Sequence, residues 1–125
     1  MTRESYIGIG VDIEKISRFY CIQKNNSLLH KIFTKKELEY CLAKKNPAPH
    51  LAARYVGKEA VVKAVNNIKN KKASILDYKK IEIYNDASGV PEVNLKKSNL
   101  NNLIIKISLS HCRDKAIAFV IAIRQ

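Results

Sequence analysis

Residues 51–65, LAARYVGKEAVVKAV, constrain the fold more than any other stretch, because their spacing predicts a helix with two apolar sides. At about 100° per residue, these sides carry Leu51, Tyr55 and Val62 on one and Ala53, Val56, Gly57, Ala60 and Ala64 on the other. Both sides can pack against other elements, so we expect the rest of the chain to be organised around this helix.

The charged residues of this helix point in different directions. Glu59 and Lys63 are four residues apart and lie between the two apolar sides, whereas Arg54 and Lys58 project elsewhere. A carboxylate with packing surfaces on both sides is costly to desolvate unless a cation or a metal ion meets it. The simpler interpretation is a solvated i,i+4 ion pair, worth about 0.2–0.5 kcal/mol. Helical spacing alone leaves both interpretations open.

The start of the chain predicts a short buried strand over residues 6–13, YIGIGVDI. Gly8 and Gly10 within it would let another backbone or a ligand approach closely, and packing is the simpler of these two roles. Asp12 stands where the strand ends and a helix is expected, so its carboxylate either caps that helix or binds a hard cation. With Glu59 as a second carboxylate, it would suit Mg²⁺ together with phosphate oxygens and water.

Helices and connecting segments are predicted on both sides of the central helix. They are a helix over 13–33 with a break at 25–27, a helix over 35–43, a stiff proline connector at 46–49 and a loop or frayed helix end over 66–80. Thr34 and Glu37 form a capping-box pattern before the second of these helices, and Pro49 suits the first turn of the central helix.

The C-terminal part of the chain changes to strands. These are predicted over residues 81–84, 90–95, 104–110 and 116–123. The turn NDASG joins the first two as an antiparallel hairpin, and the turn HCRD joins the last two. The sum is one α+β domain over residues 1–125, with an N-terminal strand, three helices and a small antiparallel sheet.

The charge of the chain favours an anionic partner. Lys and Arg number 23 against 11 Asp and Glu, a net charge of +12, and the hydrophobic fraction of 46% assigns this charge to a folded surface. Nucleic acid, phosphate-bearing small molecules, an acidic protein and an anionic membrane surface are all candidates.

Cysteine usage indicates a reduced, cytoplasmic setting. Cys21, Cys41 and Cys112 are odd in number and form neither a CxxC pair nor a zinc-binding pattern. No signal peptide is expected in the first 30 residues, and the longest apolar run, residues 116–123, is too short to cross a bilayer. His111, beside two serines, is either a hydrogen-bonded turn residue or a ligand-binding one.

Five segments together carry a stronger signal than any of these motifs alone. They are GIGVDIEKISRF (8–19), IFTKKELEYC (32–41), LAARYVGKEAVVKA (51–64), IEIYNDASGVPEV (81–93) and ISLSHCRDKAIAFVIA (107–122). In this combination, nearly end to end, the chain resembles the holo-acyl-carrier-protein synthases, the short bacterial-type 4′-phosphopantetheinyl transferases.

The resemblance implies a role for each residue that matches a family motif. It implies catalytic residues Asp12, Glu59 and Lys63, with Asp12 and Glu59 as metal ligands, coenzyme-binding residues Arg54, Lys58, Lys63, Gly89, Pro91 and His111, and carrier-protein-binding residues Arg18 and Ile22. The family also implies its own α+β fold and a homotrimer with active sites between subunits.

The reaction implied by the resemblance is Mg²⁺-dependent transfer of 4′-phosphopantetheine from coenzyme A to a serine of apo-acyl carrier protein. It yields holo-acyl carrier protein and adenosine 3′,5′-bisphosphate, in fatty acid biosynthesis. The general base is either Glu59 or a metal-bound water. The preferred carrier, the use of Mn²⁺ and the acceptance of acylated coenzyme stay open.

The chain departs from the family pattern at two places near the expected nucleotide. Val65-Asn66-Asn67 stands where the family has an aromatic residue and a Gly-Thr-Gly loop, and His50 replaces an aromatic residue before LAAR. Two other classes are weighed against an enzyme: a nucleic-acid-binding module, which lacks any RNA-binding or zinc-finger motif here, and a non-catalytic trimer that binds coenzyme A.

Overall fold

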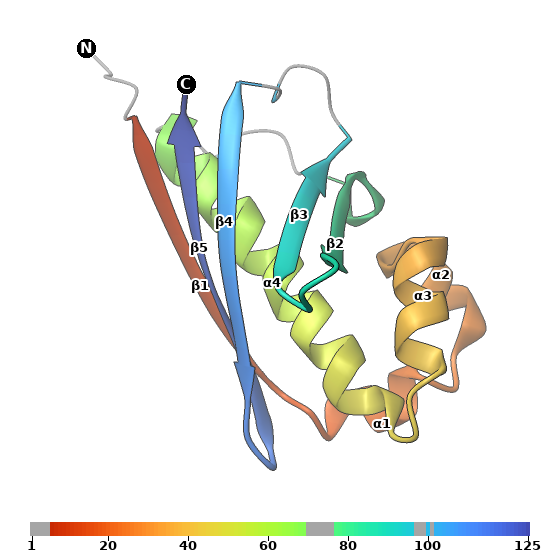
Figure 1. The fold of residues 1–125 in the computed structure, drawn as a ribbon. Helices are drawn as coiled ribbons and strands as arrows, with labels where there is room; N and C mark the ends of the chain where they lie inside the picture. The colour runs from red at the N-terminus through yellow and green to blue at the C-terminus, as the bar shows by residue number, and fades with distance from the viewer. Residues whose placement is uncertain (1–5, 70–76, 97–99, 101) are drawn as a thin grey trace.

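Helix α4 (Pro47–Lys69) lies along one face of an antiparallel sheet in which β5 (Lys115–Arg124) is flanked by β1 (Ile7–Lys15) and β4 (Leu103–His111) (Figure 1). The structure is a computed structural model and describes residues 6–69, 77–96, 100 and 102–125. The arrangement confirms the predicted α+β class and the central place of the helix over residues 51–65.

Small residues bring α4 close to this sheet. The buried sheet face is built from Gly8, Gly10, Ala116, Ala118, Val120 and Ala122. A methyl group added at Gly10 would overlap the carbonyl oxygen of Ala60, and one added at Gly8 would overlap that of Ala64. The two glycines therefore allow the helix backbone to approach the strand, which is the packing role predicted for them.

The opposite face of the same sheet is apolar and exposed. We term it the outer sheet face, and it consists of Ile7, Ile9, Val11, Ile13, Ile104, Ile117 and Phe119. These side chains share one face because the register pairs Val11 with Phe119 and Ile13 with Ile117, two residues apart on each strand. A contiguous apolar surface of this kind marks an interaction site.

Three short helices lie beside the first half of α4 (Figure 1): α1 (Arg18–Ile22), α2 (Asn26–Ile32) and α3 (Lys35–Leu42). Helices α1 and α3 pack against α4, and α2 packs against α1 and the segment Tyr78–Lys80. Their core side chains include Phe19, Leu29, Ile32, Leu38 and Cys41. The predicted capping box is confirmed at α3, where the Thr34 side chain accepts from the Glu37 amide and the Glu37 carboxylate accepts from the Thr34 amide.

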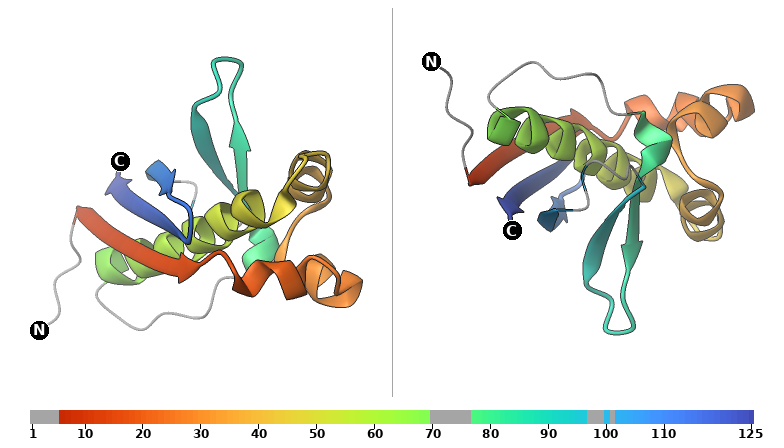
Figure 2. Two further views of the ribbon diagram at one scale, coloured as in Figure 1. Left: turned by 90° about the horizontal axis from the view of Figure 1, so that it is seen from below. Right: turned by 90° about the horizontal axis from the view of Figure 1, so that it is seen from above.

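A second sheet of two strands, β2 (Ile81–Asn85) and β3 (Pro91–Leu95), forms the predicted hairpin, and β4 and β5 confirm the last two predicted strands. The hairpin projects away from α4 and the larger sheet (Figure 2). The 3₁₀ helix η1 (Tyr78–Lys80) precedes it.

The helix predicted over residues 13–33 is only partly correct. Its first residues belong to β1, because Ile13 continues the strand pairing with Ile117 of β5. The predicted break is confirmed, since Asn25 caps the separate helix α2 by accepting a hydrogen bond from the Leu28 amide.

Helix α4 is longer than predicted at both ends. It begins at Pro47, so the predicted connector is wrong; the fixed φ and missing N–H of proline suit the first helical turn. It ends at Lys69, so the first residues of segment 66–80 extend the helix, in accord with the second of the two alternatives for this segment, while residues 70–76 lie outside the described part of the chain. No helix within the described ranges is both long and apolar enough to cross a bilayer.

Candidate functional site

Asp12, Glu59 and Lys63 come together where β1 runs beside α4. Lys63 Nζ lies 3.2 Å from Asp12 Oδ1 and donates to the Val11 carbonyl at 3.0 Å. Burial raises the pKa of Asp12, the hydrogen bond from Lys63 opposes this shift, and the negative charges of Glu59 and Glu14 add to it. Glu59 lies one helical turn before Lys63 on α4, so its carboxylate neighbours the Lys63–Asp12 ion pair. We term Asp12, Glu59 and Lys63 the carboxylate site.

Two tyrosines adjoin the Glu59 carboxylate. The hydroxyl of Tyr78 donates a hydrogen bond to Glu59 Oε1. Burial raises the pKa of Tyr78, and the bond to Glu59 raises it further, so this hydroxyl keeps its proton. Tyr55 stands one turn before Glu59 on α4, where burial and then the charge of Glu59 raise its pKa. The rings of Tyr55 and Tyr78 are 6.0 Å apart.

The donor chemistry of the carboxylate site fits Mg²⁺. Hard cations take oxygen ligands, and Mg²⁺ is held by one or two carboxylates together with water and substrate phosphates. Asp12 and Glu59 supply two such carboxylates, on a strand and a helix that pack directly together. Over the described ranges, no group of three or more His, Cys, Asp or Glu side chains is gathered that could hold a metal ion by itself.

Arg54 belongs to a second cluster. Its guanidinium lies 4.2 Å from the centre of the Tyr40 ring, and its Nη2 atom donates to Asn85 Oδ1 at 3.3 Å. Its Nε atom is buried and has no hydrogen-bond partner in the described part of the chain. A pocket of about 250 Å³ opens here, lined by Lys36, Tyr40, Arg54, Ile83, Tyr84 and Asn85. A guanidinium with an unused donor beside a pocket suits an anionic ligand.

His50 and His111 extend this second cluster. Their rings are 6.5 Å apart, and the His50 ring is 5.9 Å from that of Tyr40. Burial lowers the pKa of His50, and the positive charges of Lys44, Arg54 and His111 lower it further. We term Arg54, Tyr40, His50 and His111 the arginine–histidine cluster.

The two clusters face different directions from α4. Arg54 and Glu59 are five residues apart, which in a helix of 3.6 residues per turn separates them by about 140° around the axis. The structure thus brings Asp12, Glu59 and Lys63 together, and Arg54 and His111 together, but does not merge the two groups.

The surroundings of Lys58 do not fit the coenzyme-binding role predicted for it. Its side chain is fully buried, and its Nζ atom lies 2.7 Å from Glu37 Oε1 and donates to the carbonyls of Tyr78 at 2.7 Å and Ile81 at 2.6 Å. These three partners use the three ammonium hydrogens, so no donor is left for a phosphate. Lys58 instead ties α4 to α3 and to the start of β2.

The remaining predicted residues lie outside both clusters. Gly89, with φ of 84°, and Pro91 belong to the projecting hairpin, and an added side-chain atom at Gly89 would meet nothing within 4 Å. Arg18 and Ile22 stand on α1, where Arg18 Nη1 pairs with Glu14 Oε2 at 2.6 Å. The roles predicted for these four residues stay predictions.

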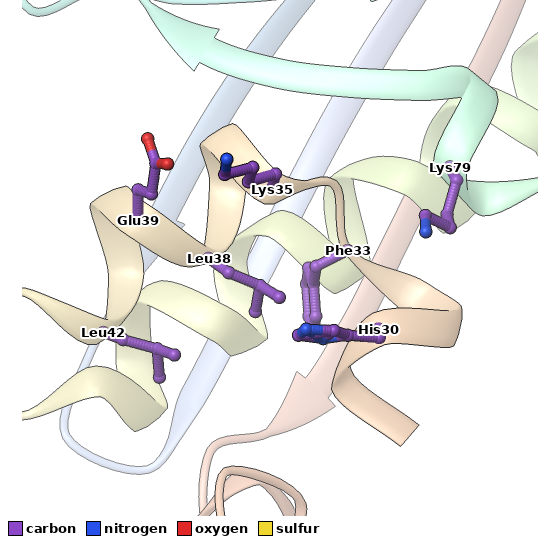
Figure 3. A pocket seen from close by; sticks show the side chains of 7 residues that line it. All are labelled: His30, Phe33, Lys35, Leu38, Glu39, Leu42 and Lys79. Carbon is purple, nitrogen blue, oxygen red and sulfur yellow. The ribbon is translucent and has the colours of Figure 1, made fainter. Parts of the chain in front are cut away.

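A pocket of about 420 Å³ between α2, α3 and η1 is separate from both clusters (Figure 3). It is lined by His30, Phe33, Lys35, Leu38, Glu39, Leu42 and Lys79, none of which is a predicted site residue. The candidate site therefore does not coincide with this hollow.

Sequence reasoning missed Tyr55, Tyr78 and Tyr40. The i,i+4 spacing of Tyr55 and Glu59 was a usable signal, since residues four apart share a helix surface. Tyr78 is 19 residues from Glu59 and Tyr40 is 45 residues from Asn85, so no local pattern connects either pair.

Comparisons with known proteins show the family to which the chain belongs. Residues 8–120 match the family model described as the 4′-phosphopantetheinyl transferase superfamily. The holo-[acyl-carrier-protein] synthase of Thermodesulfovibrio yellowstonii is 43% identical over 91% of this chain and 96% of its own length, and that of Protochlamydia amoebophila is 42% identical over 92% and 96%.

A solved structure gives the same result for the fold. The holo-(acyl-carrier-protein) synthase of Bacillus anthracis in complex with CoA (3′,5′-ADP) superimposes with a TM-score of 0.78 at 26% identity, covering 94% of this chain and 96% of that one. With a family model spanning residues 8–120 and relatives above 40% identity over most of the sequence, the chain belongs to the 4′-phosphopantetheinyl transferase superfamily.

Proposed function

We propose that this protein transfers 4′-phosphopantetheine from coenzyme A to a serine hydroxyl of an apo-acyl carrier protein, in fatty acid biosynthesis. The observation that carries the proposal is the carboxylate site, where Asp12 and Glu59 adjoin Lys63 in a chain of this superfamily. Support also comes from the relatives named as holo-[acyl-carrier-protein] synthases and from the neighbour solved with coenzyme A.

In the proposed reaction the serine oxygen attacks the phosphorus that carries the pantetheine group. The new bond joins that phosphorus to the serine oxygen, and the broken bond releases adenosine 3′,5′-bisphosphate. Mg²⁺ held by Asp12 and Glu59 would supply positive charge against the pyrophosphate oxygens. Lys63 Nζ, 3.2 Å from Asp12, adds a second positive charge for the leaving group. The serine proton passes to Glu59 or to water.

We assign the 3′-phosphate of the coenzyme to the arginine–histidine cluster. Arg54 offers the unused buried Nε donor there, and His111 adds an exposed imidazole. Because this cluster and the carboxylate site face different directions from α4, one coenzyme molecule would take its pyrophosphate contacts from one subunit and its 3′-phosphate contacts from the next.

A homotrimer would provide such a site between subunits. The outer sheet face supports this part of the proposal, because side chains such as Phe119 and Val11 expose 44% and 50% of their area on a continuous apolar surface. A further copy of the chain is the occupant we assign to this face. The three cysteines are free, which accords with the cytoplasmic setting that we include in the proposal.

We assign the carrier protein to α1. Arg18 is exposed there, and its guanidinium lies 5.6 Å from the centre of the Tyr55 ring, one helical turn from Glu59. An acidic carrier bound at Arg18 would therefore deliver its serine to the carboxylate site. The net charge of +12 would speed the encounter.

The test is intact-mass spectrometry of an apo-acyl carrier protein incubated with this protein, coenzyme A and Mg²⁺. We expect a mass gain of one phosphopantetheine group, and no gain with chelator, with Asp12→Ala or with Glu59→Ala. Binding of coenzyme A without any mass gain on several carriers would instead favour a non-catalytic coenzyme-binding trimer.

A further inference from the structure

Tyr78 makes the most specific contact to the carboxylate site from outside α4 and β1. Its hydroxyl donates to Glu59 Oε1, and its ring is half-buried against Tyr55. Tyr78 is the donor in this contact, because its phenolic hydroxyl carries the hydrogen and Glu59 Oε1 accepts it. This hydrogen bond uses one of the lone pairs of Glu59 Oε1, and the carboxylate keeps further lone pairs for a cation.

The backbone of Tyr78 is held by the buried ammonium group of Lys58. The Tyr78 carbonyl accepts a hydrogen bond of 2.7 Å from Lys58 Nζ, and Lys58 is in turn paired with the buried Glu37 at 2.7 Å. At the start of η1, the Asp77 side chain accepts from the Lys79 amide at 3.0 Å. The backbone of η1 is therefore held both from α4 and from within.

The contact from Tyr78 also explains why Glu59 and Lys63 do not neutralise each other. Lys63 pairs with Asp12 at 3.2 Å, while Glu59 receives its hydrogen bond from Tyr78 on another element. A carboxylate held by a fixed neutral donor keeps its orientation, and residues behind a metal ligand tune a metal site in this way.

From these contacts we infer that Tyr78 is a positioning residue, which orients the Glu59 carboxylate for a divalent cation, and that the buried Glu37–Lys58 pair holds Tyr78 in place. This inference rests on the proposed function, because it assumes that Asp12 and Glu59 bind the cation. In this inference Lys58 has a positioning role, because it holds the Tyr78 backbone.

Mn²⁺ titrations followed by electron paramagnetic resonance test the inference, with the full chain and saturating coenzyme A. We expect Tyr78→Phe, which keeps the ring and removes the hydroxyl, to weaken Mn²⁺ binding roughly 10- to 100-fold. Tyr6→Phe removes a hydroxyl from an exposed ring and should bind like the unchanged protein. Circular dichroism of both variants checks that the fold is kept.

A double variant separates positioning from a general structural effect. If Tyr78 acts through Glu59, then Tyr78→Phe should have no further effect on Mn²⁺ binding in a Glu59→Gln background. Equal loss in both backgrounds, or unchanged affinity of Tyr78→Phe in a protein that binds Mn²⁺, overturns the role of Tyr78 alone. An unchanged protein that binds no Mn²⁺ overturns the proposed metal site and this inference with it.

Discussion

Glu37 Oε1 lies 2.7 Å from Lys58 Nζ, and both side chains are fully buried. The same carboxylate accepts from the amides of Thr34 and Ile83, and Lys58 donates to two further carbonyls. Burial lowers the pKa of Lys58, and the charge of Glu37 opposes that shift. The pair thus joins α3, α4 and β2 through one set of satisfied buried groups.

Removing one charge of this pair should be severely destabilising. Glu37→Gln leaves the Lys58 ammonium buried without a counter-charge, so we expect a loss of about 3–5 kcal/mol in the free energy of unfolding. Denaturant titration measures it, and Glu39→Gln on the exposed face of the same helix is the matched control. Equal stability of the two variants would contradict the importance of the pair.

The sequence predicts local features of this region and misses the distant ones. The Thr34 and Glu37 cap is readable because it depends on residues three apart. The hydrogen bond from the Ile83 amide to Glu37 joins residues 46 apart, so no periodicity in the sequence predicts it. The same reason explains why the sequence suggests a phosphate-binding role for Lys58: its charge is visible in the sequence, whereas its burial depends on packing between three elements.

The candidate site divides in the same way. Motif spacing predicts that Asp12, Glu59 and Lys63 belong to one site, and in the structure they lie together. Motif spacing does not reveal Tyr78, because its hydroxyl contacts Glu59 only once the folded chain brings η1 back to α4. The end of β1 was misplaced because Ile13 suits helical spacing and strand alternation equally, and pairing with β5 decides between them.

Gly10 should tolerate no side chain. Because a methyl group there would overlap the Ala60 carbonyl on α4, we expect Gly10→Ala to lower the free energy of unfolding by about 3 kcal/mol. Gly89→Ala is the control, since space is open there and only the positive φ of 84° is strained, at about 1 kcal/mol. Thermal unfolding compares them, and a smaller loss at Gly10 than at Gly89 would show that the sheet can move away from α4.

His50 should make stability depend on pH. Its pKa is lowered in the folded protein from an ordinary value of 6.5, by burial and then by Lys44, Arg54 and His111. The unfolded chain therefore binds the proton more readily, so stability is full above about pH 6.5 and falls as pH decreases below it. We expect His50→Gln to lose part of this fall between pH 7.5 and 5.5, and the exposed His30→Gln to retain it, in urea titrations at each pH. Identical pH profiles of the two variants would rule out His50 as the cause.

Arg18→Glu should impair recognition of the carrier protein while sparing the coenzyme. Reversing an exposed charge that faces an acidic partner replaces attraction by repulsion, so we expect KM for the carrier to rise roughly tenfold or more. KM for coenzyme A should stay unchanged, because Arg18 contacts Glu14 and Tyr55 and neither cluster directly. Lys35→Glu makes the same charge reversal on α3 and serves as the control. A rise in both KM values for Arg18→Glu would refute its assignment to the carrier.

Phe119→Glu should separate the subunits. Its side chain lies centrally on the outer sheet face, paired with Val11 of β1 and Ser108 of β4, so a carboxylate there would be buried without a partner in a trimer. Sedimentation velocity should then show a folded monomer, and the transfer reaction should be lost because each site would lack its second subunit. Leu42→Glu changes a side chain of similar exposure, 47% against 44%, away from this face, and should remain an active trimer. An active monomer of Phe119→Glu would show instead that one subunit holds the whole coenzyme, and that the carboxylate site and the arginine–histidine cluster serve the reaction from opposite sides of a single α4.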